Sequence, residues 1–338
     1  MSFPHTATQG LVAVIIPVYN VEGYLEKCLD SVLGQTYTNI DAIAVNDGST
    51  DGSLAILEEK ASKDSRLRVI TQPNSGLSAA RNKGLISLLP ETQFITFVDS
   101  DDWLPNDAIQ NMVYCLLERQ ADVVCGLYDC TEFDGSRCIT CSEDHFLNDN
   151  VISREMMFDL LVNHLKYKYF FAWGKLYRKE ILEGFQFPVG KFFEDSICHR
   201  IYGKCKRIAF LNKIVYHYFR RPGSIAHSGY DIRWLDSIEI LVDRIKYLRV
   251  ERFHKLSISC MIGIYVRMRE ILLKIPHLDA AIRERVNYLR SMLAIEYQKS
   301  SFEGLSFKER ISLWANYHFF WLLFYRWKLH YRHIRDAK

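Results

Sequence analysis

The sequence predicts an α/β fold, in which helices flank a sheet that begins with parallel strands, followed by a helical extension. Short apolar runs alternate with segments of helical spacing over the first hundred residues. Aspartate-rich and asparagine-rich segments follow the ends of these runs. Helical patterning is nearly continuous from Ile232 onward and is broken by Pro276. Strand–helix alternation with short connections implies parallel strands joined by right-handed crossovers.

The first half of the chain yields its elements in order. The apolar run Val12–Ile16 ends at Pro17 and predicts a buried strand, and Leu25–Leu33 has the spacing of a helix. Asp51 is a candidate N-cap for the second helix. The expected elements after the first helix are a strand at 40–46, a helix at 54–61, a strand at 67–71, a helix at 78–89 and a strand at 94–98.

The pattern changes after Ala121. Residues 122–133 and 137–141 flank Asp134-Gly135, a strong signal for a hairpin. A helix is expected at 155–164, and the segment 170–221 is too irregular to be one element. We therefore expect two domains, an α/β domain at 1–230 and a helical region at 231–338.

Composition limits the class of protein. About half of the 338 residues are apolar and a quarter are charged, as in globular proteins. Met1–Gly10 has no basic region followed by an apolar core, and the nine cysteines without such a signal favour reduced thiols in the cytoplasm. Residues 312–338 carry five Lys/Arg and one acid, which gives this tail a net charge of +4. The whole chain has a net charge of +3, so the residues before the tail carry −1. No nucleic-acid partner is expected, because a protein that binds nucleic acid more often spreads a basic stripe over its main domain, and here the excess basic charge lies in the tail.

The segment Asp99–Asp102 directly follows the apolar run Phe94–Val98. The carboxyl ends of parallel strands form the edge at which open α/β sheets bind ligands. Close-set aspartates there suit a hard divalent cation, which in turn suits a diphosphate. The residues alone thus indicate an enzyme that acts on a nucleotide or phosphorylated substrate.

Two further polar segments follow strands at the same edge. Taken alone, Asp47–Asp51 is a turn before a helix cap. Asn74–Asn82 opens a helix whose free N–H groups, with Arg81, would hold an anion, although a simple cap has the same pattern.

The combination is more specific than its parts. Pro17–Asn20, Asp47–Asp51, Asn74–Gly76 and Asp99–Asp102 follow four successive strands. In motif, order and spacing they resemble the family 2 glycosyltransferases of the GT-A fold, over about residues 11–228. The resemblance implies a Rossmann-like, nucleotide-binding mixed sheet flanked by helices. It also implies transfer of a sugar from a nucleotide donor, usually a UDP-sugar, with inversion at the anomeric carbon.

By this resemblance, Pro17 and Tyr19 line the nucleotide pocket and Asp47 recognises the uracil edge. Asp99 would bind the ribose, and Asp101 would bind the Mn²⁺ or Mg²⁺ that bridges both phosphates. A cation and arginines suit this chemistry, because negative charge grows on the diphosphate leaving group. The same site is expected to include Asn20, Asn74, Arg81 and Ser100.

Further assignments carry alternatives. Asp102 either supports the site from behind or caps the helix that follows Pro105. Trp173 either stacks on a sugar ring or packs in the core. The segment that contains Arg221 and Ser224 resembles the family's closing segment over the pyrophosphate, and its alternative is a solvated basic turn.

An inverting displacement needs a base that takes the proton of the acceptor hydroxyl. The family usually supplies this base from an acidic pair, and Glu194-Asp195 fits that pattern. We assign Asp195 as the base and Glu194 as structural. The alternative is acidic decoration of a helix N-terminus.

The C-terminal tail is rich in aromatic and basic residues. Leu313, Tyr317, Phe320/Trp321, Phe324 and Tyr331 fall roughly on one helical face. This pattern favours a helix that lies in a membrane interface, with a helix packed on the catalytic domain or on another subunit as the alternative.

The sequence thus predicts an inverting, metal-dependent glycosyltransferase with a glycan or lipid-linked acceptor. It would serve surface polysaccharide or lipopolysaccharide synthesis, in the cytoplasm and peripheral to the inner face of a bacterial membrane. The alternatives are a nucleotidyltransferase, which the lack of a glycine-rich phosphate motif near residue 20 disfavours, and a non-catalytic binding scaffold. The oligomeric state is left open.

Overall fold

A computed structural model of the chain describes residues 10–132, 137–138, 150–163, 171–190, 197–221, 231–275, 277–303 and 305–336. The chain divides into two compact units. The first consists of residues 1–157, 171–190 and 201–227, and the second of residues 158–170, 191–200 and 228–338. Two short helices, α5 (Arg154–Asn163) and α7 (Cys198–Tyr202), contain residues of both units.

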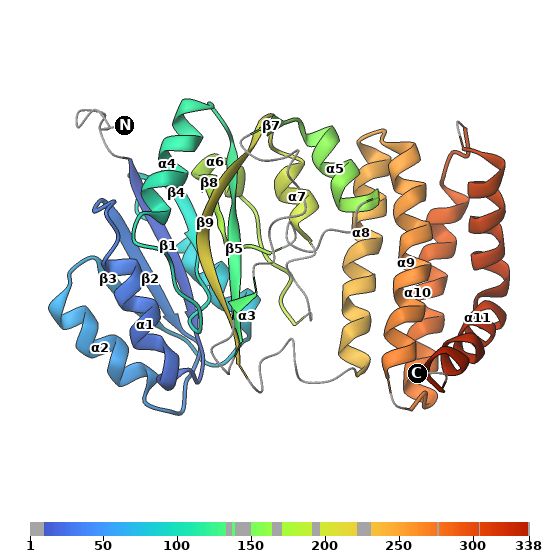
Figure 1. Cartoon of the computed structure of the whole chain (residues 1–338), viewed down its shortest axis with the longest axis horizontal. Coiled ribbons are helices and arrows are strands. Elements are labelled where there is room, and N and C mark those ends of the chain that lie inside the picture. The colour runs from blue at the N-terminus through green and yellow to red at the C-terminus, as the bar shows by residue number, and fades with distance from the viewer. Residues whose placement is uncertain are drawn as a thin grey trace. The chain divides into compact units, whose positions relative to one another are not determined.

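The first unit is built on one mixed sheet in the order β3-β2-β1-β4-β8-β5-β9-β7, with β6 paired to β5 (Figure 1). The strands β1 to β4 are parallel, β8 runs antiparallel between β4 and β5, and β9 is parallel to β5. The strands are β1 (Leu11–Val18), β2 (Ile40–Asn46), β3 (Leu67–Thr71), β4 (Thr92–Phe97), β5 (Val123–Glu132), β6 (Arg137–Cys138), β7 (Val151–Ile152), β8 (Lys175–Arg178) and β9 (Ile208–Arg220).

Strand β1 continues through Pro17, where the sequence predicts an end. The carbonyl of Ile15 accepts from the Val98 N–H on the β4 side, and that of Val18 accepts from the Asp47 N–H on the β2 side. Because backbone groups alternate sides along a strand, the nitrogen of Pro17 points toward β4. The register with β4 ends at Ile15, so no ladder bond is lost where proline lacks its N–H.

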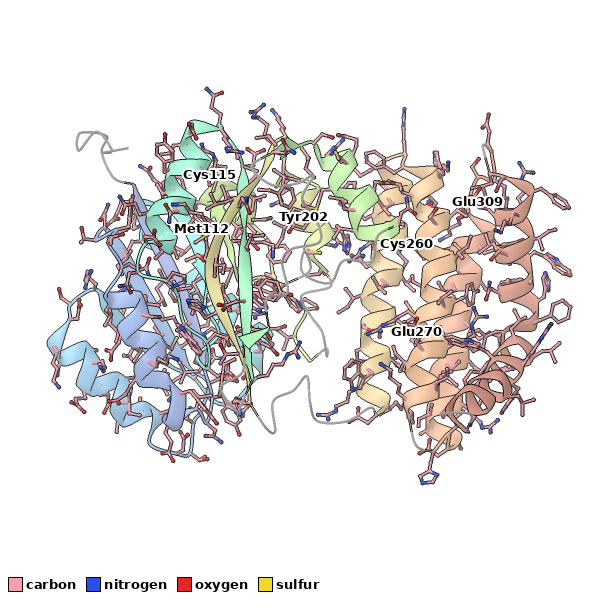
Figure 2. The ribbon with its side chains drawn as sticks, in the orientation of Figure 1. Met112, Cys115, Tyr202, Cys260, Glu270 and Glu309 are labelled. Atoms are coloured by element: carbon pink, nitrogen blue, oxygen red, sulfur yellow. The ribbon has the colours of Figure 1, made fainter. Side chains whose placement is uncertain are left out.

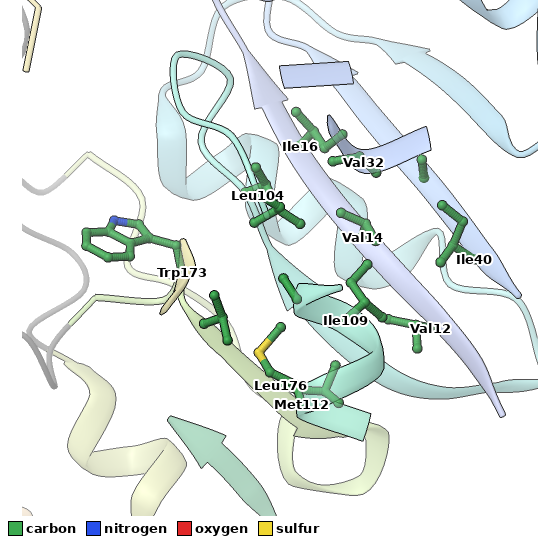
Figure 3. Close-up of a cluster of buried hydrophobic side chains, with 14 of the residues drawn as sticks. Val12, Val14, Ile16, Val32, Ile40, Leu104, Ile109, Met112, Trp173 and Leu176 are labelled. Carbon is green, nitrogen blue, oxygen red and sulfur yellow. The ribbon is translucent and has the colours of Figure 1, made fainter. Parts of the chain in front are cut away.

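Helices cover both faces of this sheet. They are α1 (Glu22–Leu33), α2 (Ser53–Lys63), α3 (Leu77–Ile86), α4 (Ala108–Glu118) and α6 (Lys179–Leu182). Val12, Val14 and Ile16 alternate along β1 and join one buried cluster with Val32 of α1 and Met112 of α4 (Figure 3). Met112 and Cys115 of α4 are both buried (Figure 2). On the other face of β1, Gly84 of α3 lies against Ile15.

The predicted α/β fold and its first four strands are confirmed. The predicted hairpin is also confirmed, because β5 and β6 pair antiparallel with Cys130 opposite Cys138. Its turn, residues 133–136, lies outside the described residues. The segment 170–221 contains β8 and β9, which the sequence did not resolve as separate elements. All the cysteines whose side chains are described are buried free thiols.

The second unit is helical. Its main helices are α8 (Asp236–Val250), α9 (His254–Lys274), α10 (Ala280–Gln298) and α11 (Phe307–Asp336), preceded by a 3₁₀ turn at Ile232–Leu235. Ion pairs join α10 to α8, with Arg285 3.0 Å from Asp236 and Arg249 3.1 Å from Glu296. No helix in the described part of the chain is long and apolar enough to cross a membrane.

The structure corrects the interpretation of the tail helix α11. Leu313, Phe320 and Phe324, which the sequence places on a membrane-facing stripe, are fully buried. The ring of Phe320 lies 6.0 Å from that of Tyr265 on α9. The apolar periodicity of this face therefore reflects packing between helices. A residue with non-helical dihedral angles, Phe319 (φ −117°, ψ 28°), kinks α11 near its middle.

The contact between α3 and β1 predicts the effect of one substitution. A Cβ at Gly84 would lie 2.4 Å from Ile15 Cγ2, so Gly84→Ala should lower the free energy of unfolding by about 1–3 kcal/mol. Gly23→Ala on α1 is the matched control, because a Cβ there meets nothing within 4 Å and should stabilise by about 0.5 kcal/mol. Urea unfolding of both variants measures the difference. Equal stability of the two variants would contradict the packing described here.

Candidate active site

The candidate site lies at the sheet edge where β1, β2, β3 and β4 end. Because these strands are parallel and adjacent, the segments that follow them meet at one edge, as the sequence predicts. Each segment is fastened to a neighbour by hydrogen bonds, so the site has a defined backbone.

The loops after β1 and β2 are joined through Asn20. Its N–H donates to Ser49 Oγ at 3.2 Å, and its Oδ1 accepts from the Thr50 N–H at 2.8 Å. Asn20 has φ +50°, a left-handed conformation that asparagine adopts more readily than most residues. This residue therefore fixes the turn that presents Tyr19, whose side chain is exposed.

The carboxylate of Asp47 organises the loop after β3. Its Oδ1 accepts from Gln72 Nε2 at 2.7 Å and from the Ser75 N–H at 2.9 Å, and its Oδ2 accepts from the Gly76 N–H at 2.8 Å. The Asp47 side chain is buried as a result. Next to it, Gly48 has φ +71° and would place a Cβ 2.7 Å from a backbone nitrogen, so glycine is required there. Asp47 thus holds this loop in place, while its predicted contact with uracil stays a prediction.

Asp99 follows β4 and pairs with an arginine from α3. Arg81 Nη2 lies 2.9 Å from Asp99 Oδ1, and the Arg81 side chain is buried. A buried guanidinium beside a carboxylate is stabilised only when its geometry and hydrogen bonds are good, and removal of one partner is costly. The pair therefore locks the start of α3 to the end of β4, and both residues belong to the predicted site.

Asp101 pairs with a second arginine, at the end of β9. Arg221 Nε lies 2.6 Å from Asp101 Oδ2, and the same guanidinium lies over the ring of Tyr24 at 5.7 Å. Burial raises the pKa of the Asp101 carboxyl above its ordinary value. The hydrogen bond from Arg221 opposes this rise, and the charge of Asp99 adds to it. The structure thus brings together Asp101 and Arg221, which the sequence places 120 residues apart.

Asp102 holds the aspartate segment against strand β9. Of its two predicted roles, it therefore has the supporting one and not that of a helix cap. Its Oδ2 accepts from the Tyr216 hydroxyl at 2.7 Å, and its Oδ1 accepts from the Phe219 N–H at 2.7 Å. Burial raises the pKa of Asp102 well above its ordinary value, and the charges of Asp101 and Asp99 raise it further. Both oxygens are directed to β9, so Asp102 ties the β4 loop to that strand.

Sequence reasoning missed Tyr216, which is fully buried. Its hydroxyl accepts from the Asp99 N–H at 3.0 Å and donates to Asp102 Oδ2, so one atom touches both ends of the aspartate segment. Burial raises the pKa of Tyr216 well above its ordinary value, and Asp102 and Asp99 raise it further, so the hydroxyl keeps its proton. No local motif marks this tyrosine, because its role arises only when β9 pairs with β5.

A second link between the two segments involves His217. Its backbone forms a bridge with Trp103, and its ring stacks on the Trp103 indole at 5.5 Å. His217 Nδ1 lies 2.5 Å from Asp129 Oδ1 on β5. Lys27 Nζ lies 3.0 Å from the centre of the Trp103 ring. These contacts give His217 a structural role within the sheet.

Trp173 lies in an aromatic cluster. Its ring is parallel to those of Phe171, Tyr216 and Tyr218, with centroids at 4.5, 4.4 and 5.6 Å, and the side chain is 4% exposed. This arrangement is the core packing that was the alternative to sugar stacking for Trp173. The cluster includes Tyr216, the tyrosine that holds the aspartate segment.

The remaining predicted residues are distributed as follows. Asn74 and Tyr19 are exposed at the edge, whereas Ser100 and Pro17 are buried. Asp195 and Ser224 lie outside the described residues.

The donor set near Asp101 fits a hard divalent cation. The charge of Asp99 raises the pKa of Asp101, and the charges of Asp99 and Asp101 raise that of Asp102, so a cation would relieve this repulsion. The side chain of Asp101 retains 20% exposure beside Arg221, so its carboxylate is accessible to a ligand. Among the described residues, however, no three His, Cys, Asp or Glu side chains already converge as a metal site.

Sequence comparison assigns most of the first unit to a known family. The family described as Glycosyl transferase family 2 matches residues 13–185, which is just over half of the chain. The glycosyltransferase GlyA of Streptococcus pneumoniae serotype 4 is 38% identical over 243 residues, which cover 70% of this chain and 34% of GlyA. The minor teichoic acid biosynthesis protein GgaA of Bacillus subtilis is 30% identical over 259 residues, which cover 74% of this chain and 53% of GgaA. The chain thus spans about a third of one relative and about half of the other.

A solved structure has the same fold. TarS of S. aureus, in complex with UDP-GlcNAc, matches with a TM-score of 0.56 at 22% identity, covering 89% of this chain and 78% of that chain. This likeness confirms the predicted GT-A fold.

The position of Tyr216 predicts a measurable loss of stability. Tyr216→Phe removes the hydroxyl that serves Asp99 and Asp102 and leaves buried polar groups without it, which should lower the free energy of unfolding by about 1–3 kcal/mol. Tyr288→Phe is the control, because that side chain is 49% exposed and should change stability little. Chemical denaturation followed by circular dichroism measures both. A neutral Tyr216→Phe would mean that the aspartate segment does not depend on this hydroxyl.

Proposed function

Because the chain belongs to glycosyl transferase family 2, we propose that it transfers a sugar from a UDP-sugar to a hydroxyl group of a glycan or lipid-linked acceptor. The observation that carries this proposal is the aspartate segment Asp99–Asp102, held at the ligand-binding edge by two arginines and by β9. The UDP-GlcNAc named with TarS supports a UDP-sugar donor. The similarity to GgaA, a minor teichoic acid biosynthesis protein, supports a place in bacterial surface polysaccharide synthesis.

The donor would lie across the ends of β1 to β4. Pro17 and Tyr19 would line the base pocket, with the Asp47 loop beside the uracil edge and Asp99 at the ribose. Arg221, which is at the end of β9, would face the diphosphate together with Ser224. Arg221 retains 24% exposure and would donate to a phosphate there, since charge-assisted hydrogen bonds to phosphate are strong.

Asp101 would hold the divalent cation, Mn²⁺ or Mg²⁺. When bound, such an ion supplies positive charge opposite the diphosphate leaving group and lowers the barrier to its departure. Arg221 now pairs with one oxygen of Asp101, so the arginine and the ion would share this carboxylate or exchange on it. The buried Asp102 and Tyr216 would keep the backbone of Asp101 in position throughout.

Asp195 would act as the general base. Its carboxylate is ionised near neutral pH when unperturbed, since the ordinary pKa of aspartate is about 3.9. It would take the proton of the acceptor hydroxyl as that oxygen bonds to the anomeric carbon and the bond to the UDP oxygen breaks. A single displacement of this kind inverts the configuration at that carbon.

The proposed setting is the cytoplasmic side of the cell membrane, where lipid-linked acceptors are presented. We propose a peripheral association through the C-terminal tail, which carries the basic excess of the sequence. Lipopolysaccharide is one class of glycan that this proposal includes.

Nucleotide release tests the proposed reaction. Purified protein should release UDP from one member of a panel of UDP-, GDP-, CMP- and dTDP-sugars in the presence of manganese, and release should stop with chelator. Release is measured with a coupled nucleotide assay, first with water and then with cell-extract acceptors.

Asp101→Ala is the control for the cation, because it should remove metal-stimulated release while the protein stays folded. UDP binding without release from any donor, with or without extract, would instead indicate a non-catalytic binding scaffold. Release of pyrophosphate from a nucleoside triphosphate and a sugar 1-phosphate, supplied in a parallel assay, would indicate a nucleotidyltransferase.

A pair of isosteric variants tests the base. Asp195→Asn should lower turnover by about 10²-fold or more, since general base catalysis contributes that much, and should leave UDP binding unchanged. Glu194→Gln, at the adjacent position, is the matched control and should retain most of the activity. Steady-state kinetics and UDP titration are the two measurements. The opposite result, with Glu194→Gln inactive and Asp195→Asn active, would move the base to Glu194.

A further inference from the structure

Helix α11 carries an exposed apolar stripe on the side that does not pack within the helical unit. We define the exposed stripe as Ile311, Trp314, Leu322, Tyr325 and Leu329, all of which are exposed. Within each half of the kinked helix these residues recur every three or four positions, which places them along one face. Leu322 is 66% and Leu329 60% exposed, an unusual display of large aliphatic side chains in one row.

The buried face of α11 keeps this stripe turned outward. Leu313, Phe320 and Phe324 are fully buried, and Arg269 Nη1 of α9 donates to Asn316 Oδ1 at 2.8 Å. Rotation of the helix to hide the stripe would expose three buried apolar side chains and break this hydrogen bond. The exposed stripe is therefore a stable feature of the helical unit.

Cations border the exposed stripe. Lys308, Arg310 and Arg326 are exposed, and Lys328 lies next to Leu329 in the sequence. Over residues 307–329 the sequence has these four cations and one acid, Glu309. The carboxylate of Glu309 accepts from the Ser306 N–H at 2.8 Å, so it serves the start of the helix. The face thus joins apolar and aromatic side chains with a net positive charge.

This combination selects one occupant. A second copy paired about a two-fold axis would bring the same cations together, so charge disfavours self-association through this face. An anionic lipid surface attracts the cations and accepts the aliphatic side chains, and Trp and Tyr favour the boundary between water and hydrocarbon. We propose that the exposed stripe lies on an anionic lipid surface. The proposal rests on the peripheral location proposed above, and it assigns membrane contact to a face of α11 that the sequence pattern did not indicate.

Vesicle binding by the full chain tests this inference. The protein should bind vesicles of phosphatidylcholine and phosphatidylglycerol in equal parts, and bind vesicles of phosphatidylcholine alone more weakly. Leu322→Gln with Leu329→Gln should weaken binding by about tenfold or more, because two aliphatic side chains no longer leave water. Arg326→Gln should weaken binding to the anionic vesicles alone, by about fivefold. Co-sedimentation at two salt concentrations measures these changes.

Ile295→Gln with Val250→Gln is the matched control, since both are exposed aliphatic side chains on other helices of the same unit. Equal losses in the two double variants, or unchanged binding after substitution of the stripe, would overturn the inference. A dimer that the wild type forms and the stripe variant lacks, without vesicle binding, would assign the stripe to a second copy. Sugar transfer is measured without vesicles and vesicle binding without donor, so either proposal can fail alone.

Discussion

The candidate active site depends on one buried connection, between Asp102 and Tyr216. Asp102 is almost fully buried, and its two oxygens accept from the Tyr216 hydroxyl and the Phe219 N–H. A carboxylate is costly to bury unless such hydrogen bonds are made, so this link is stable only when β9 is in register beside β5. This link also holds in place Asp99 and Asp101, which we propose face the ligand.

The loops of the site are held by polar side chains that serve the protein rather than a ligand. Asp47 holds the loop after β3, and Asn20 joins the loops after β1 and β2. Such fixed hydrogen bonds limit the rearrangement that a ligand must drive, which is the usual advantage of a preorganised polar site. Asp47 shows that a residue can match a family motif and still have both oxygens engaged within the chain.

The sequence was informative where structure is local. Apolar runs that are followed by proline or by polar turn residues predicted β1 to β4, because strand ends and turns are set by neighbouring residues. Strand β9 was missed, since its importance lies in pairing with β5 and in bringing Tyr216 and Arg221 to residues more than a hundred positions earlier. The ion pairs Arg81–Asp99 and Arg221–Asp101 likewise could not be predicted from the sequence, although the sequence identified each of these four residues separately. For Asp195 and Ser224 the functional roles stay predictions.

Helix α11 shows why an apolar pattern does not by itself identify a membrane-facing surface. The helix has apolar side chains on two faces, and the sequence periodicity does not indicate which of the two packs against other helices. The structure separates them, because Leu313, Phe320 and Phe324 are buried while Trp314 and Leu322 are exposed. The cations beside the exposed stripe then favour one kind of partner for this face. Burial against another protein would require an acidic partner for each cation, whereas an anionic lipid surface provides negative charge along its whole extent.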